Sequence, residues 1–166
     1  FTVKMYLPAY NYGSFSGQKL NLNLTKNNNV IGADITNEGL IYGDTVYFNN
    51  IDILAKAVGN SFQTALQWQN SIFNKGRIEV VGTVKSTTSF ELEVLPFDLL
   101  LEGDRWVSDK NAQFYYDEQR IAVRDLEIKN GNQLVAIDGR LSKFNEDKLL
   151  FTIKEFQLAS LKYFLG

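Results

Sequence analysis

The sequence predicts an all-β fold, in which one long, curved, mainly antiparallel sheet forms a trough with an apolar concave face. Three observations predict it. Apolar and polar residues alternate with period two along most of the chain, turn-forming residues separate the alternating stretches, and one strand motif occurs twice. No segment keeps a 3.6-residue period long enough for an amphipathic helix. We therefore expect roughly ten to twelve strands joined by short turns.

The expected strands and turns follow in chain order. Alternation predicts strands over residues 19–24, 30–36, 40–58, 62–68, 78–84, 90–94 and 97–101, a short one from Trp106, and strands over 121–128, 135–141 and 149–153. Residues that favour turns lie between them, at 26–29, 37–39, 59–60, 71–76, 86–88, 103–104, 109–111, 130–131 and 145–147. Pro96 interrupts the alternation, as at a bulge or a sheet corner. The stretch 156–165 fits either a short helix or an irregular edge piece.

The repeated motif carries most of the information about architecture. Its copies read Val46-Tyr47-Phe48-Asn49-Asn50-Ile51-Asp52-Ile53 and Ile121-Ala122-Val123-Arg124-Asp125-Leu126-Glu127-Ile128. In both, the alternation shifts phase by one residue at the central polar pair. A β-bulge produces such a shift and bends its strand, so we expect a bulge or register shift at each pair. Recurring bends curl a sheet steadily. Repetition therefore favours a trough, although periodicity alone also fits a closed barrel or a two-sheet sandwich.

One face of the predicted strands is apolar, and it is the candidate binding groove. Its candidate lining residues are Leu20, Leu22, Leu24, Phe62, Leu66, Trp68, Ile78, Val80, Val84, Phe90, Leu92, Val94, Ile121, Val123, Val135, Ile137, Phe151 and Ile153. The alternative is that these residues form an ordinary buried core. Trp68 and Trp106 have a further alternative, as platforms on which sugar rings stack.

Composition excludes several classes of function. The chain has no cysteine and no histidine, so it cannot form disulfides, thiolate metal sites, a cysteine nucleophile or an imidazole base. Its 19 acidic residues leave carboxylate catalysis open, but no spacing marks a catalytic pair. We expect a non-enzymatic protein without catalytic residues, metal or cofactor. The net charge of −2, with no basic patch, indicates that nucleic acid is not a partner.

The chain is expected to be one β-rich fragment, residues 1–166, of a larger repeat-built protein. It begins at Phe1 without an initiator methionine, and no Pro-rich or Ser-rich linker interrupts it. It has no long unbroken apolar run, so this piece is not expected to span a membrane. Any targeting or anchoring segment would lie outside it.

The C-terminal third resembles the TamB family, and in particular its large members in Bacteroidetes-type bacteria. The resemblance is carried by residues 122–133 (AVRDLEIKNGNQ), 137–142 (IDGRLS), 147–150 (DKLL) and 156–161 (FQLASL). It implies a periplasmic protein anchored in the inner membrane, whose body is a taco-shaped β-sheet with an apolar groove. It also implies that the groove guides phospholipids or unfolded outer-membrane proteins between the two membranes. The implied outer-membrane partner is a barrel of the TamA type. The family offers no catalytic residues to carry over.

Two other functions fit an all-β chain of this length. One is a closed lipid-binding barrel of lipocalin size, although the Gly103-Asp104-Arg105-Trp106 cluster lies mid-chain, whereas that family has its Gly-x-Trp near the start. The other is a carbohydrate-binding sandwich of a secreted protein, which a flat strip of exposed aromatic residues would support. An enzyme is the third and weakest possibility, because histidine and cysteine are absent.

Overall fold

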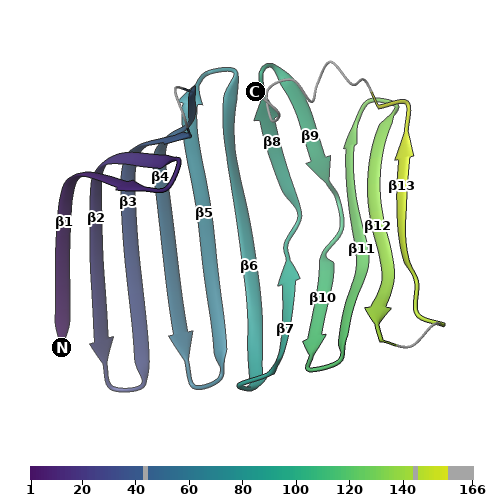
Figure 1. Ribbon diagram of the computed structural model, residues 1–166, viewed down its shortest axis with the longest axis horizontal. Helices are drawn as coiled ribbons and strands as arrows, with labels where there is room; N and C mark the ends of the chain where they lie inside the picture. Colours follow the sequence, from purple (N-terminus) through teal and green to yellow (C-terminus); the bar gives the residue numbers. More distant parts are fainter. Residues whose placement is uncertain (43–44, 144–145, 157–166) are drawn as a thin grey trace.

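The chain forms a single antiparallel sheet of thirteen strands (Figure 1). The computed structural model describes residues 1–42, 45–143 and 146–156, and these contain no helix and therefore none that could cross a membrane. The strands are β1 (Thr2–Tyr12), β2 (Phe15–Asn27), β3 (Val30–Tyr42), β4 (Thr45–Val58), β5 (Ser61–Ser71), β6 (Asn74–Ser86), β7 (Ser89–Val94), β8 (Phe97–Leu101), β9 (Asp104–Ser108), β10 (Ala112–Asp117), β11 (Arg120–Asn130), β12 (Gln133–Ser142) and β13 (Leu149–Lys154).

Strands that are neighbours in the chain are mostly neighbours in the sheet. β1 to β6 form a meander, and β11 to β13 form another. Between them, β7 pairs with β10 while β8 pairs with β9, so each of these pairs is one half of a long hairpin. Pro96 divides one arm of this hairpin, as expected. The strand number exceeds the expected ten to twelve because β1 and β10 were not among the predicted strands. The predicted turn at 109–111 is wrong, because these residues divide the other arm without reversing its direction.

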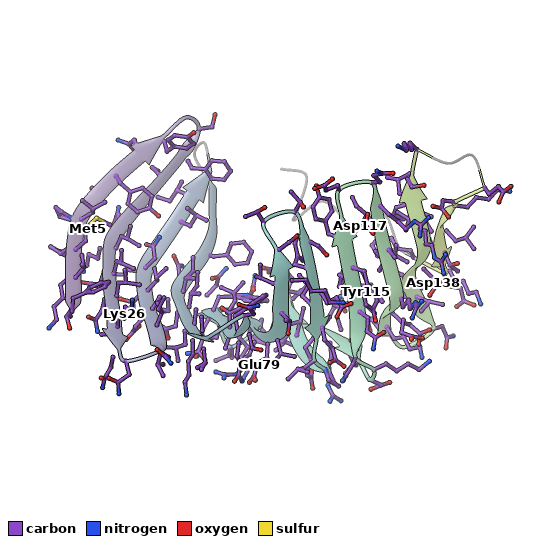
Figure 2. The ribbon with its side chains drawn as sticks, turned by 90° about the horizontal axis from the view of Figure 1, so that it is seen from below. Met5, Lys26, Glu79, Tyr115, Asp117 and Asp138 are labelled. Atoms are coloured by element: carbon purple, nitrogen blue, oxygen red, sulfur yellow. The ribbon has the colours of Figure 1, made fainter. Side chains whose placement is uncertain are left out.

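The sheet is open. In the described part of the chain, β1 pairs only with β2 and β13 only with β12, so these two strands are its edges. Figure 2 shows the sheet curled into a trough, with β1–β4 and the strands from β10 onward rising on either side of the middle strands. The two rival architectures, a closed barrel and a two-sheet sandwich, are therefore wrong for the described residues. The predicted curved trough is confirmed.

Both predicted phase shifts occur, by two different means. At the second motif copy, Asp125 has a left-handed backbone (φ 57°), and the β11–β12 register shifts between Val123 and Leu126, as in a bulge. At the first copy, Asn50 is also left-handed (φ 48°). Phe48 and Ile51 both pack against the core cluster of Trp68, Phe97, Leu99 and Trp106, although residues three positions apart point to opposite faces of a regular strand. The register between β3 and β4 shifts before this pair, between the partners Leu40–Phe48 and Ile41–Val46, so its predicted place at Asn49-Asn50 is wrong.

A further copy of the bend lies inside β2 at Lys19, and Glu155, directly after β13, has the same left-handed backbone. The φ angles of Lys19 and Glu155 are 49° and 48°. Each is followed by an apolar, a polar and an apolar residue, as Leu20-Asn21-Leu22 and Phe156-Gln157-Leu158. A left-handed residue breaks the alternation of faces along a strand and bends it. The bend is therefore a recurrent device of this sheet.

The predicted turn at Asn37-Glu38-Gly39 is wrong, because these residues lie inside β3. They mark the same line of bends. The flanking register partners place Glu38 opposite both Lys19 of β2 and Asn50 of β4. The Lys19 Nζ lies 2.5 Å from Glu38 Oε2. The left-handed residues of β2 and β4 thus flank Glu38 of β3 on one line across the sheet.

Candidate functional site: the apolar face of the sheet

The strand register brings the apolar residues into continuous rows across the sheet. One row consists of successive register partners from β1 to β6, namely Met5, Leu22, Ile35, Ile53, Leu66 and Ile78. A second row runs through Val80, Val94 and Ala112, and a third through Leu92, Phe114 and Val123. Register partners point to the same side of a sheet, as do alternate residues of one strand. We call this side the apolar face.

The predicted groove residues all lie on this apolar face, as their register partners show. Leu7 opposes Leu20, Phe62 opposes Gly82, Val84 opposes Phe90, and Ile121 opposes both Tyr116 and Leu141. In the last two strands, Val135 opposes Ile153 and Ile137 opposes Phe151. Their use as a groove for a ligand is a proposal, argued below.

Several further residues lie on the apolar face that were not among the predicted groove residues. The same register adds Val3 and Met5 of β1, Ile35 of β3, Ile51 and Ile53 of β4, and Ile128 of β11. The period-two signal was present in β1, where Val3, Met5 and Leu7 alternate with polar or aromatic residues. For β4 and β11, the bends at Asn50 and Asp125 obscured which phase pointed inward.

The opposite face is polar and hydrogen-bonded along its rows. Asp52, Gln67 and Arg77 are register partners on β4, β5 and β6. Gln67 Nε2 donates to Asp52 Oδ2 at 2.8 Å, and Arg77 Nη1 donates to Gln67 Oε1 at 2.9 Å. Glu79, two residues further along β6, projects from the outer side of the trough in Figure 2. The polar face is thus the convex one, and the apolar face lines the trough.

The deepest part of the apolar face is a cluster of Trp68, Phe97, Leu99 and Trp106. Phe48 meets the Trp68 ring edge-on at 5.5 Å between centroids, and Phe156 lies 5.7 Å from the Trp106 ring. Trp68 Nε1 donates to Asn74 Oδ1 at 3.1 Å, which satisfies its only polar atom. Each tryptophan is 7% exposed. Buried rings of this kind are not platforms for stacking sugars, so that alternative is wrong for both residues.

Three aromatic rings on this sheet lie over glycines of the adjacent strand. Tyr10 opposes Gly17, Trp68 opposes Gly76, and Phe62 opposes Gly82. A Cβ atom added to these glycines would lie 2.1, 2.4 and 2.5 Å from the respective ring. The rings occupy the space of the missing side chains, an arrangement known to compensate for glycine in strands. Sequence alone could not reveal these pairs, because they depend on register.

Away from the cluster, the apolar face is open. Among the described residues, no large side chain is fully buried. Leu66 is 37% exposed and Val84 is 44% exposed, although both lie inside rows of apolar neighbours. Of the predicted groove residues, Trp68 and Val123 are buried. In the described part of the chain, this single-layer sheet has no second layer that covers the rest of its apolar face.

Comparison with known proteins does not assign this site. No protein-family model, no curated protein and no solved structure matches the chain. The chemistry of the face is therefore read from its own residues. It presents methyl, methylene and aromatic groups, with charged side chains confined to the other side and the rims. Such a surface binds by excluding water.

Proposed function

We propose that this chain is a non-enzymatic segment of a periplasmic, TamB-like protein anchored in the inner membrane. Its apolar face shields phospholipid acyl chains, or apolar segments of unfolded outer-membrane proteins, during transfer between the membranes. The observation that carries the proposal is the uninterrupted apolar row from Met5 to Ile78, on a face left half-exposed. Soluble monomers rarely leave an apolar surface of this extent uncovered.

The mechanism needs no cofactor and no chemical step. Moving an acyl chain through water exposes each of its methylene groups, and burying each one is worth about 0.8 kcal/mol. A trough whose apolar rows follow one another across strands lets the acyl chain move from one set of contacts to the next. Each step then exchanges one apolar contact for another, and the free energy changes little along the path. The open side accommodates a headgroup in water.

The resemblance to TamB supplies the cellular setting of the proposal, including a TamA-type barrel as outer-membrane partner. The structure supports the proposal through its shape, since a long, open, curled sheet with an apolar inner face is what the resemblance implies. Trough and inner face extend to both edge strands. A lipid path could thus continue beyond either edge.

The tryptophans allow a direct test. Trp68 and Trp106 are the only two in the chain, and both lie on the apolar face. Purified, delipidated protein is titrated with phosphatidylcholine carrying brominated acyl chains, which quench indole fluorescence on contact. We expect quenching by the brominated lipid and none by the same lipid without bromine. If the brominated lipid co-purifies with the protein but does not quench its fluorescence, the lipid binds away from the tryptophans, and this would contradict the proposal.

A further inference from the structure

Two turns at one end of the sheet carry exposed apolar side chains. In the antiparallel meander from β1 to β6, the turns that follow β1 and β5 lie at the same end (Figure 1). Tyr12 and Phe15 flank the first turn and are 83% and 47% exposed. Ile72 and Phe73 form the second turn and are 70% and 59% exposed. The β3–β4 turn between them, at 43–44, lies outside the described residues.

The turns at the opposite end of this meander are polar. Those that follow β2, β4 and β6 read Asn28-Asn29, Gly59-Asn60 and Thr87-Thr88. At the first end, the turns after β8 and β11 are polar as well, as Glu102-Gly103 and Gly131-Asn132. Polar residues and glycine are typical of hairpin turns in water. Among the described turns, the apolar ones are thus confined to one half of one end.

The turns at the two ends of β6 show that the fold does not require apolar residues there. Each turn has two residues between a pair of register partners, and a register shift adjoins each pair. In one, Ser71 Oγ accepts a hydrogen bond from Phe73 N–H at 3.0 Å. In the other, Ser86 Oγ accepts one from Thr88 N–H at 3.2 Å. Isoleucine and phenylalanine fill the first turn and two threonines fill the second, so this type of turn accepts either.

The backbone of the apolar turn is prepared for an apolar medium. Phe73 C=O accepts a hydrogen bond from Gly103 N–H at 2.8 Å, and Phe73 N–H already donates to Ser71 Oγ. Both backbone groups of Phe73 therefore keep their partners when water is excluded around them. Burial of an unpaired N–H or C=O group in lipid would cost free energy, and here that cost does not arise.

We propose that these two turns insert into the surface of a zwitterionic phospholipid bilayer. Aromatic residues are enriched at the interface between lipid and water, and exposed aliphatic side chains gain free energy there. The turns are four strand spacings apart, about 19 Å along the sheet, and a fluid bilayer receives both without a matching pocket for either. Lys75 follows the Ile72-Phe73 turn and Glu102 accepts a hydrogen bond from Asn74 beside it. Their opposite charges give no preference for anionic lipid.

A polarity-sensitive dye tests the contact, because the chain has no cysteine of its own to label. Ile72→Cys and Thr87→Cys occupy the same position in the two matched turns of β6, and Tyr12→Cys reports on the β1–β2 turn. Each variant is labelled with a nitrobenzoxadiazole dye and mixed with phosphatidylcholine vesicles. We expect brighter, blue-shifted emission at positions 12 and 72 and no change at 87. An equal change at 72 and 87, or no change at 12 or 72, would overturn the proposal.

Vesicle flotation measures the binding with unlabelled protein. The double variant Ile72→Thr/Phe73→Thr takes the threonines of the matched turn, so it should fold, and circular dichroism checks its strand content. We expect it to bind vesicles about tenfold more weakly or less. Val58→Thr is the control, since Val58 is 46% exposed beside the turn at the opposite end, and it should bind as wild type. Added salt should change little.

Two flotation results would overturn the proposal. A wild type that does not float with vesicles would leave a protein as the partner of these turns. A double variant that floats as well as wild type would place the lipid contact elsewhere. Neither result bears on lipid transport along the apolar face, which this inference does not require and which the tryptophan quenching experiment tests separately.

Discussion

Asn50 and Asp125 occupy the same position in two copies of one motif and share the same left-handed backbone, with φ of 48° and 57°. Residues with a Cβ adopt this conformation at a cost of roughly 1–2 kcal/mol, so its recurrence indicates that the sheet needs the bend. At both positions the next residue, Ile51 or Leu126, belongs to the apolar face. The bend thus sets which side chains line the trough.

Substitutions at Asp125 should follow the order that left-handed backbone dictates. We expect Asp125→Gly to change the free energy of unfolding by less than about 1 kcal/mol, and Asp125→Val to lower it by about 2 kcal/mol more. Glu127, in regular strand two residues later, is the control. There glycine should be the worse substitution, because valine favours strands. Urea denaturation of the four variants measures this, and the same order at both positions would contradict the assigned bend.

The Tyr10–Gly17 pair predicts a strong coupling between two positions. Gly17→Ala places a methyl group within 2.1 Å of the Tyr10 ring, so the ring must move and lose its hydrogen bond from Asn37 Nδ2. We expect this variant to lower the free energy of unfolding by about 1–3 kcal/mol. In a Tyr10→Ala background the same substitution should cost much less. Purely additive effects in a double-mutant cycle would show that the ring does not cover the glycine.

Local patterns predicted the strands because alternation and turn residues act over short range. Gly59-Asn60 is a hairpin turn as expected, and the turn predicted at Asn130-Gly131 is present one residue later, at Gly131-Asn132. The wrong turn at Asn37-Glu38-Gly39 has a physical reason, since Asn37 Oδ1 accepts the local hydrogen bond from Gly39 N–H that is typical of a turn, but does so inside a strand. Register, by contrast, is a property of two strands at once. No local signal showed that Phe62 would oppose Gly82.

The left-handed residues Lys19 and Glu155, which the motif did not include, show a second limit. Lysine and glutamate are uncommon at left-handed positions, which asparagine and aspartate adopt more easily. A motif defined on Asn49-Asn50 and Arg124-Asp125 therefore passed over Gln18-Lys19 and Lys154-Glu155. The alternation of apolar and polar residues on either side of Lys19 and Glu155 was the signal that could have revealed them. The apolar face itself was predictable, because it follows from that alternation.

Stability should vary little between pH 6 and 9, since the chain has no histidine. The hydrogen bond from Arg105 lowers the pKa of Asp98, so this pair stabilises the fold above the ordinary carboxyl pKa and is lost as pH falls through the lowered value. The hydrogen bond to Glu38 raises the pKa of Lys19, so that pair's contribution is lost as pH rises through the raised value. Both pairs are exposed and their effects are small.

Urea denaturation across the pH range checks this expectation. The midpoint should form a plateau that falls at its acidic and alkaline ends. Asp98→Asn should flatten part of the acidic fall, and Lys19→Gln part of the alkaline one. A sharp transition near pH 6.5 would require a titrating group that these pairs do not supply.

Site-specific photo-crosslinking in living cells tests the central claim most directly. A photoreactive residue is placed in the full-length parent protein at Leu66 or Val80, on the apolar face, and at Gln67 or Glu79, their neighbours on the polar face. Because adjacent strand residues point to opposite sides, the two sets differ in little but direction. The account predicts phospholipid or outer-membrane protein adducts from Leu66 and Val80, and none from Gln67 and Glu79. Equal capture from both sets, or capture from neither, would contradict it.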